Sequence, residues 1–170
     1  MRRLAVIVAA IGLVVMGAGV VSAGVGRLSP DLQAVRSAVA RFHSVEQAAA
    51  AGYRPGSPCE SSPRGTMGVH YVNGPLAGDP AIDPLRPEVL LYLPDGSGDL
   101  KLVAVEYLRF DADQDLATDN DRPSLFGQPF QGPMLGHGPG MPIHYDLHVW
   151  IAAANPAGLF AQWNPAIHCS

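Results

Sequence analysis

The sequence predicts one α+β domain, in which a helix or helix pair packs on an antiparallel β-sheet of about four to five strands. Three observations support this fold class. Residues 29–53 carry two helix-start patterns and an apolar stripe with helical spacing. Several later segments alternate apolar and polar residues and are separated by turn sequences. Two cysteines far apart in the chain can connect its loop-rich parts.

The first 23 residues have the composition of a secretory signal peptide. Arg2 and Arg3 precede an apolar run over 4–21, and small residues around Ser22 and Ala23 suit signal peptidase. The run is also long enough to span a bilayer, so an uncleaved anchor is the alternative. We expect cleavage before Gly24, which leaves 24–170 as a single α+β domain in a secreted or periplasmic protein.

The charge of the exported part restricts its partners. The whole chain has 11 basic and 15 acidic residues, and removal of the signal peptide makes the balance still more acidic. A basic surface for nucleic acid or for anionic membranes is therefore not expected. The partner is expected to be a small molecule or an envelope component, with no membrane contact after signal cleavage.

Cys59 and Cys169 are the two cysteines of the chain. In an exported protein an even pair predicts a disulfide, here between the segment after the helices and the C-terminal tail. Two free thiols or a two-cysteine metal site are the alternatives.

The helical region begins at Ser29-Pro30-Asp31, which supplies an N-cap hydroxyl, a proline at the first helical position and a carboxylate in the first turn. A second start, the capping box that begins at Ser44, precedes an alanine run that ends at Gly52. We predict two short helices or one kinked helix. The following 54–65 segment is rich in Pro, Gly and Ser and predicts irregular structure.

Three strands are predicted next, over 67–73, 88–93 and 100–110, the last two joined by a hairpin turn at 94–99. Strict alternation places Glu106 on the same face as Leu100, Leu102, Ala104 and Leu108. A carboxylate on an apolar face is costly unless it is paired, protonated or bound to a metal.

Residues 143–151 fit two structures. As a strand they place His144, Asp146, His148 and Trp150 on one face, opposite an apolar face. As a helix after Pro142 they place His144 and His148 one turn apart. The β-branched and aromatic residues and the period of two favour the strand.

The acidic loop at 111–121 begins like a calcium loop, with Asp111, Asp113 and Asp115 at alternate positions. It then departs from the EF-hand pattern, since Leu116 occupies the place of the turn glycine and Arg122 that of the bidentate glutamate. Either a solvated acidic loop or a non-standard calcium site results. Residues 123–140 are predicted to be loop.

Several motifs in order resemble a family of exported bacterial proteins whose members have no characterised activity. The motifs are MGxHYVN at 67–73, VEY within VEYLRF at 105–110, LHVW at 147–150, NPxGxFxxWNP at 155–165 and the helix end FHSVEQAAAAGY at 42–53. The resemblance covers most of the exported part and implies a shared fold and export. His70, Glu106 and His148 are more typical of the family pattern than His137 and His144.

The main candidate site is a transition-metal centre of His70, Glu106 and His148, with Asp146 or His144 as added ligands. Strands can each supply one imidazole or carboxylate to a shared face, which is how β-scaffolds bind zinc, copper, iron or manganese. Zinc or copper is the expected cofactor, and a catalytic role is left open. Copper would also suit three methionines that lie near histidines in the sequence, Met67, Met134 and Met141, beside His70, His137 and His144.

Two other functions compete with the metal centre. In the first, the same side chains form a buried histidine and carboxylate network in a non-enzymatic extracytoplasmic binding or structural module. In the second, His148 is the base of a metal-independent hydrolase, oriented by Asp146 or Glu106. The sequence has no G-x-S-x-G nucleophile motif for that reaction.

Overall fold

The computed structural model describes residues 28–138 and 140–169. The predicted signal peptide at 1–23 lies outside these residues. In the part of the chain that is described, no helix is both long and apolar enough to cross a membrane.

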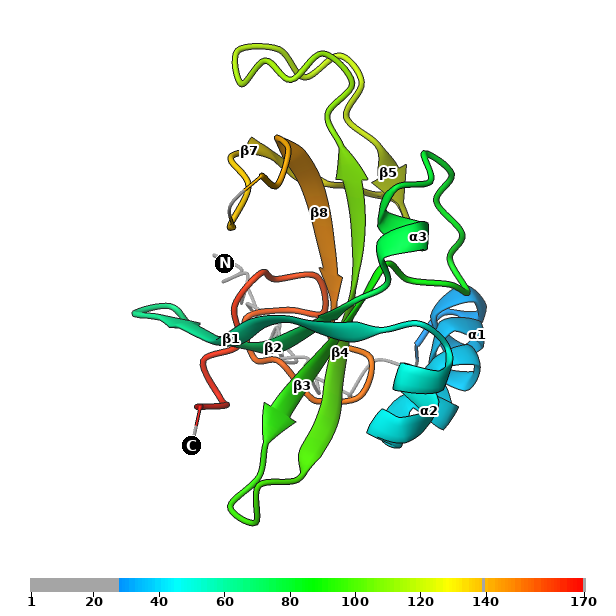
Figure 1. Cartoon of the computed structure of the whole chain (residues 1–170), viewed down its shortest axis with the longest axis vertical. Helices are drawn as coiled ribbons and strands as arrows, with labels where there is room; N and C mark the ends of the chain where they lie inside the picture. Colours follow the sequence, from blue (N-terminus) through cyan, green and yellow to red (C-terminus); the bar gives the residue numbers. More distant parts are fainter. Residues whose placement is uncertain (1–27, 139, 170) are drawn as a thin grey trace, which may run out of the picture.

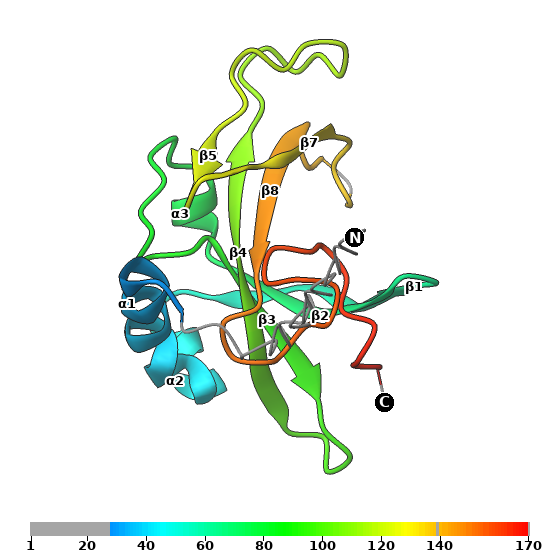
Figure 2. The same cartoon turned by 180° about the vertical axis from the view of Figure 1, so that it is seen from behind.

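The fold is built on one curled six-stranded antiparallel sheet with the strand order β1-β2-β3-β4-β8-β7 (Figures 1 and 2). Both views show β1 and β2 running across the direction of β4 and β8. The predicted antiparallel sheet is confirmed, with one strand more than expected. Its strands are β1 (Arg54–Ser62), β2 (Gly65–Val72), β3 (Val89–Pro94), β4 (Leu100–Phe110), β7 (Gln131–Met134) and β8 (His144–Val149). A separate small hairpin consists of β5 (Ser124–Leu125) and β6 (Gln128–Pro129).

The helices are few and short. α1 (Pro30–Val39) runs into the 3₁₀ turn η1 (Ala40–His43), α2 (Val45–Ala50) follows, and α3 (Gly74–Ala77) lies between β2 and β3. Both predicted N-caps are present, because the hydroxyls of Ser29 and Ser44 accept hydrogen bonds from the first turns of α1 and α2. The apolar stripe of α1 packs on the sheet, and Tyr92 donates a 2.6 Å hydrogen bond to the carbonyl of Phe42.

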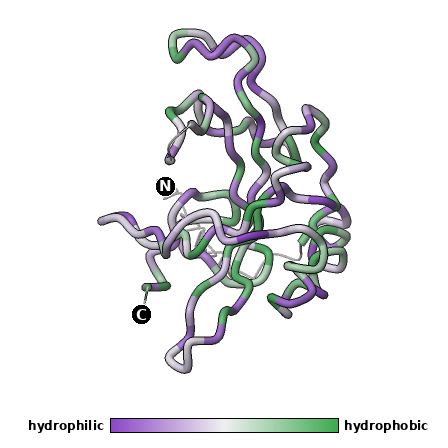
Figure 3. Tube along the Cα trace, viewed as in Figure 1, coloured by the Kyte–Doolittle hydropathy of each residue, from purple (hydrophilic) through white to green (hydrophobic). Residues whose placement is uncertain are grey.

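Hydrophobic segments gather where the strands and helices meet, whereas the tip of the β1–β2 hairpin and the loop after β4 are largely hydrophilic (Figure 3). The fold contains two apolar clusters. Alternate residues of β8 belong to the larger cluster, and the residue that follows β8 belongs to the smaller one. Tyr145, Leu147 and Val149 belong to the larger cluster, which includes α1. Trp150 belongs to the smaller one.

The predicted strand at 143–151 is confirmed as β8, and the helical alternative is wrong. The strand pairs with β4 on one side and β7 on the other, and all six of its residues are buried. Because both faces are covered, His144, Asp146 and His148 are all removed from solvent.

The prediction of which β4 residues share a face with Glu106 was partly wrong, because β4 contains a bulge. The pairing of β3 with β4 shifts by one residue between Leu91 and Tyr92, so alternation along β4 is interrupted near Val103. Leu100 and Leu102 consequently pack with the larger cluster, whereas Ala104 and Leu108 belong to the smaller one. Only Ala104 and Leu108 share the face of Glu106, because a one-residue shift moves the side chains before it to the other face of the sheet.

Two loop predictions were wrong. Most of the segment 54–65 forms strand β1 (Arg54–Ser62), which is an edge strand whose pairing with β2 is irregular between Pro55 and Cys59. Prolines are tolerated at such an edge and at bulges, and for this reason the composition misled the prediction. The 123–140 segment contains β5, β6 and β7, which are too short to show a period of two.

The predicted disulfide joins Cys59 on β1 to Cys169 in the tail. The tail also pairs with β2, since the backbone amides of Thr66 and Asn164 each donate to the other residue's carbonyl, at 3.0 and 3.1 Å. These links hold Trp163 and its neighbours beside β2, next to the candidate site.

Candidate metal centre

The candidate centre is formed by one side chain from each of three strands: His70 of β2, Glu106 of β4 and His148 of β8. Glu106 and His148 are directly opposite each other in the β4–β8 register, so their side chains point to the same face. His70 lies two strands from Glu106, beyond β3. The curl of the sheet brings β2 over this face, which alternation along one strand cannot predict.

The three ligand atoms lie close enough to one another to share one ion. Glu106 Oε2 lies 3.4 Å from His70 Nε2 and 3.8 Å from His148 Nε2, and all three atoms lie within 4.8 Å of one another. Donors about 2.0–2.1 Å from a tetrahedral zinc ion are about 3.3 Å apart. Of the described residues, no other group of three His, Cys, Asp or Glu side chains meets this distance limit.

Two of these three atoms, and both carboxylate oxygens of the adjacent Asp146, are buried without hydrogen bonds. Glu106 Oε2, both ring nitrogens of His148 and both carboxylate oxygens of Asp146 are buried without a hydrogen-bond partner. Most buried polar atoms in proteins have at least one partner, and leaving one unsatisfied costs about 1–3 kcal/mol. A structural network would satisfy these groups, so the arrangement favours an ion over a network.

Burial sets the protonation of the cluster. It lowers the pKa of His70 to about 3, which leaves this imidazole neutral and able to bind a cation. Burial also raises the pKa of Glu106 to about 8. At His148 burial disfavours the charged ring, but the carboxylates of Glu106 and Asp146 outweigh it and raise the pKa.

Neighbouring groups orient both imidazoles. The Ser57 hydroxyl donates to the carbonyl of Pro58 at 2.8 Å and lies 2.9 Å from His70 Nδ1. Since the single hydroxyl proton is used, His70 Nδ1–H donates to Ser57, and Nε2 keeps the lone pair that faces Glu106. Asp146 Oδ1 lies 3.7 Å from His148 Nδ1, on the far side of the ring from Glu106. Such partners are typical of metal-binding histidines.

A cavity of about 610 Å³ opens beside the cluster. His70 and Glu106 form part of its wall, and the side chain of His70 is 14% exposed, whereas that of His148 is 1% exposed. The remaining lining is mainly apolar, from Met67, Val72, Val89, Leu108, Met141 and Trp163, with Gly56, Ser57, Glu60, His137, Gly138 and Gln162. A small molecule in this cavity could reach the open side of the centre.

The other predicted ligands are placed differently. Asp146 supports His148 from behind and lies outside the group of three. His144 is fully buried four residues before His148 on β8, and its ring contacts that of His137 with the centroids 4.9 Å apart.

The three aspartates of the acidic loop do not converge on a common point that meets the same distance limit. Asp113 accepts hydrogen bonds from the amide of Asp115 and the hydroxyl of Thr118, and Asp115 accepts from the amide of Ala117. These carboxylates stabilise turns of their own loop. Asp111 is buried, and burial raises the pKa of its carboxyl.

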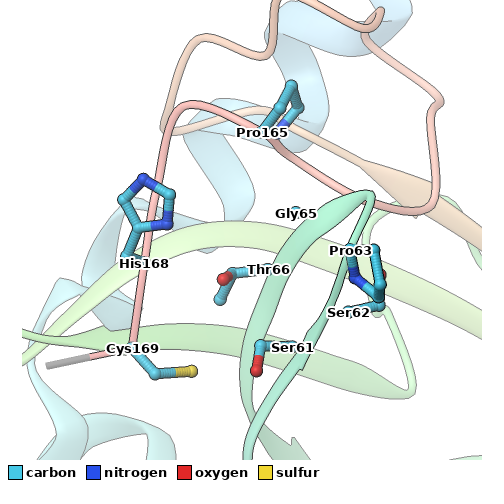
Figure 4. A pocket seen from close by; sticks show the side chains of 8 residues that line it. All are labelled: Ser61, Ser62, Pro63, Gly65, Thr66, Pro165, His168 and Cys169. Atoms are coloured by element: carbon cyan, nitrogen blue, oxygen red, sulfur yellow. The ribbon is translucent and has the colours of Figure 1, made fainter.

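A second cavity, of about 340 Å³, lies between the β1–β2 turn and the tail (Figure 4). Figure 4 shows that Ser61, Thr66 and His168 border it near Cys169. It lies where the disulfide and the Thr66–Asn164 pairing attach the tail to the hairpin. We regard it as a consequence of that attachment.

Ser57 is the functional residue that sequence reasoning missed, because 54–65 was assigned to an irregular loop. With this segment as a strand next to β2, Ser57 becomes a neighbour of His70.

Comparison of the chain with family models, with curated proteins and with solved structures finds no match in any of the three. Function is therefore inferred from the geometry of the site.

Proposed function

We propose that this protein binds one transition-metal ion, with zinc as the first candidate, through His70 Nε2, Glu106 Oε2 and His148 Nε2. The observation that carries the proposal is the convergence of three donor atoms within 4.8 Å, of which Glu106 Oε2 and His148 Nε2 are buried without hydrogen bonds. An ion at their centre would satisfy atoms that are otherwise costly to bury.

The donor set suits zinc and carries a further implication. Two imidazoles and one carboxylate are the protein ligands of a class of catalytic zinc sites, which keep a fourth position for water or substrate. His70 and Glu106 reach the cavity, so this fourth position faces the space where a small molecule can bind. An ion here would supply Lewis acidity, while the mainly apolar cavity would bind an uncharged substrate.

Export is part of the proposal. The disulfide between Cys59 and Cys169 suits an oxidising compartment, and the predicted signal peptide at 1–23 agrees with it. We place the protein outside the cytoplasm, as a secreted or periplasmic protein.

The test is metal content by mass spectrometry on the full chain, produced with its disulfide intact and without a metal-binding tag. We expect about one zinc or other transition-metal ion per chain, and loss of that ion in His70→Ala. His168→Ala is the matched control, because His168 is an exposed histidine that does not belong to the group of three ligands. A metal-free wild type that takes up no added ion would refute the proposal.

A metal-independent hydrolase is the second candidate, favoured by one observation. Ser57 Oγ, the His70 ring and Glu106 lie in a row with separations of 2.9 and 3.4 Å, which resembles a nucleophile, base and orienting carboxylate. Against it, the hydroxyl proton of Ser57 is directed to Pro58 rather than to His70. Ester hydrolysis in excess chelator that disappears in Ser57→Ala would establish this candidate instead.

A further inference from the structure

Along β8, beyond Asp146, lies a second group of metal-binding side chains that the proposed centre does not use. His144 is 0% exposed, and its Nε2 atom has no hydrogen-bond partner. Its other ring nitrogen, Nδ1, lies 3.3 Å from the carbonyl of Pro142 and therefore carries the proton. The lone pair of Nε2 is thus buried and free.

His137 faces this imidazole. The two rings meet edge to face, with their centroids 4.9 Å apart. His137 is exposed and borders the 610 Å³ cavity together with Met141. A second imidazole is therefore within reach of the free nitrogen of His144, from the solvent side.

Each of the two histidines has a methionine as a neighbour. The Met141 sulfur accepts a 3.4 Å hydrogen bond from the backbone amide of His137. The backbone of Gly136 contacts Met141 so closely that a side chain there would clash, which holds the two ends of the loop together. Met134 is paired with His144 in the β7–β8 register, so its side chain lies on the same face as the imidazole.

We propose that His144, His137 and Met141 form a second metal site, selective for copper(I), with Met134 as an additional thioether. Soft thioether sulfur combined with imidazole selects copper(I) over zinc, magnesium or calcium. The free lone pair of His144 is the fixed point of the site, and His137, Met141 and Met134 supply the other donors. Copper binding would satisfy the one buried nitrogen of His144 that the fold leaves unpartnered.

His137 and Met141 border the same cavity as His70 and Glu106, but the fixed point of the second site, His144, is distant from the first centre. His144 and His148 are four residues apart on one strand, which places their backbones about 13 Å apart. The two groups also differ in chemistry, since the first has a carboxylate ligand and no sulfur, whereas the second has sulfur. The second site can therefore be tested independently of the proposed function.

The experiment is an anaerobic copper(I) titration of the full chain against a chromophoric copper(I) chelator. It is made in the His70→Ala background, in which the first centre keeps only one imidazole. We expect one copper(I) ion per chain, and at least about tenfold weaker binding in His137→Ala and in Met141→Leu. X-ray absorption is expected to show sulfur in the copper coordination shell, reduced in Met141→Leu.

Two controls accompany the titration. His43→Ala removes an exposed histidine elsewhere, and Leu135→Ala changes an exposed side chain next to the same loop, so neither is expected to alter copper affinity. Both tested residues are partly or fully exposed, so both substitutions are expected to leave the fold intact. Unchanged copper affinity in His137→Ala and Met141→Leu, or a copper shell without sulfur, would overturn the second site. A loss of zinc at the first centre in His137→Ala would instead make His137 a ligand of that centre.

Discussion

Two buried glutamates near the same strand, β4, differ in what surrounds their carboxylates. Glu88, just before β3, is 1% exposed, and its Oε2 accepts a 3.1 Å hydrogen bond from the amide of Leu108. Glu106, on β4, is 4% exposed, and its Oε2 has no hydrogen-bond partner but two imidazole nitrogens at 3.4 and 3.8 Å. Burial raises the pKa of both, to about 7 and about 8.

Burial and a raised pKa do not by themselves identify a binding site. Glu88 has both properties of a buried acid, yet its carboxylate is held by the backbone of the neighbouring strand. Glu106 differs in facing donors that could share an ion with it. The partners of a buried carboxylate therefore separate a structural role from a binding role.

Substitution of Glu106 and substitution of Glu88 are expected to differ most in their effect on metal affinity. Glu106→Gln removes the one charged ligand of the centre, and we expect it to weaken zinc binding by at least about 100-fold. Glu88→Gln makes the same chemical change at a carboxylate held by the backbone of Leu108, and it is expected to leave zinc affinity unchanged. Competition of each variant with a fluorescent zinc chelator measures the effect. Equal affinities in the two variants would show that Glu106 is not a ligand.

The second prediction concerns Glu88 and the pH dependence of the free energy of unfolding in the metal-free protein. The folded pKa of Glu88 is about 7 and the unfolded value about 4.5, so the unfolded state holds fewer protons between these values. The free energy of unfolding then falls as pH rises from 4.5 to 7, by about 3 kcal/mol for this group.

Urea unfolding of the metal-free protein across that pH range measures this loss. Glu88→Gln stays neutral and can still accept from Leu108, so its stability curve should be flatter than that of the wild type. If wild type and Glu88→Gln showed the same pH dependence, folding would not raise the pKa of Glu88.

The third difference is stabilisation by the ion. A ligand at 100 times its dissociation constant stabilises the folded state by about 2.7 kcal/mol. We expect zinc to raise the melting temperature of wild type and Glu88→Gln by the same amount, and chelator to reverse the rise. In Glu106→Gln the shift should be nearly absent. A chelator-insensitive melting temperature in zinc-loaded wild type would contradict the proposed centre.

The smallest expected effect is that of the orienting hydroxyl. Ser57→Ala leaves the three ligands in place but removes the acceptor for His70 Nδ1–H, and such supporting contacts contribute about tenfold in metal affinity. Ser61→Ala changes an exposed serine of the same strand and should have no effect. A complete loss of zinc in Ser57→Ala would assign Ser57 a direct role in the site.

Much of the fold and part of the site could be predicted from local sequence. Helix starts at Ser29 and Ser44, the strand at 143–151 and the pairing of the two cysteines depend on short-range patterns or simple counting. The carboxylate of Glu106 among apolar residues is the local signal that indicates the centre. The resemblance to exported bacterial proteins stays a prediction.

The remainder depends on long-range geometry. The bulge in β4, which moved Leu102 to the other face, arises from pairing with β3 and leaves no mark in the alternation of residues. Ser57 was missed because its strand is rich in proline and stable only as an edge beside β2. The meeting of His70 with Glu106 depends on the curl of the whole sheet.

Anomalous X-ray diffraction from zinc-loaded crystals, recorded on both sides of the zinc absorption edge, tests the proposed centre most directly. We expect one strong anomalous peak within bonding distance of His70 Nε2, Glu106 Oε2 and His148 Nε2, on the side that faces the cavity. A map without a peak at these three atoms, at saturating zinc, would contradict the proposal and leave a buried group of polar side chains without an ion.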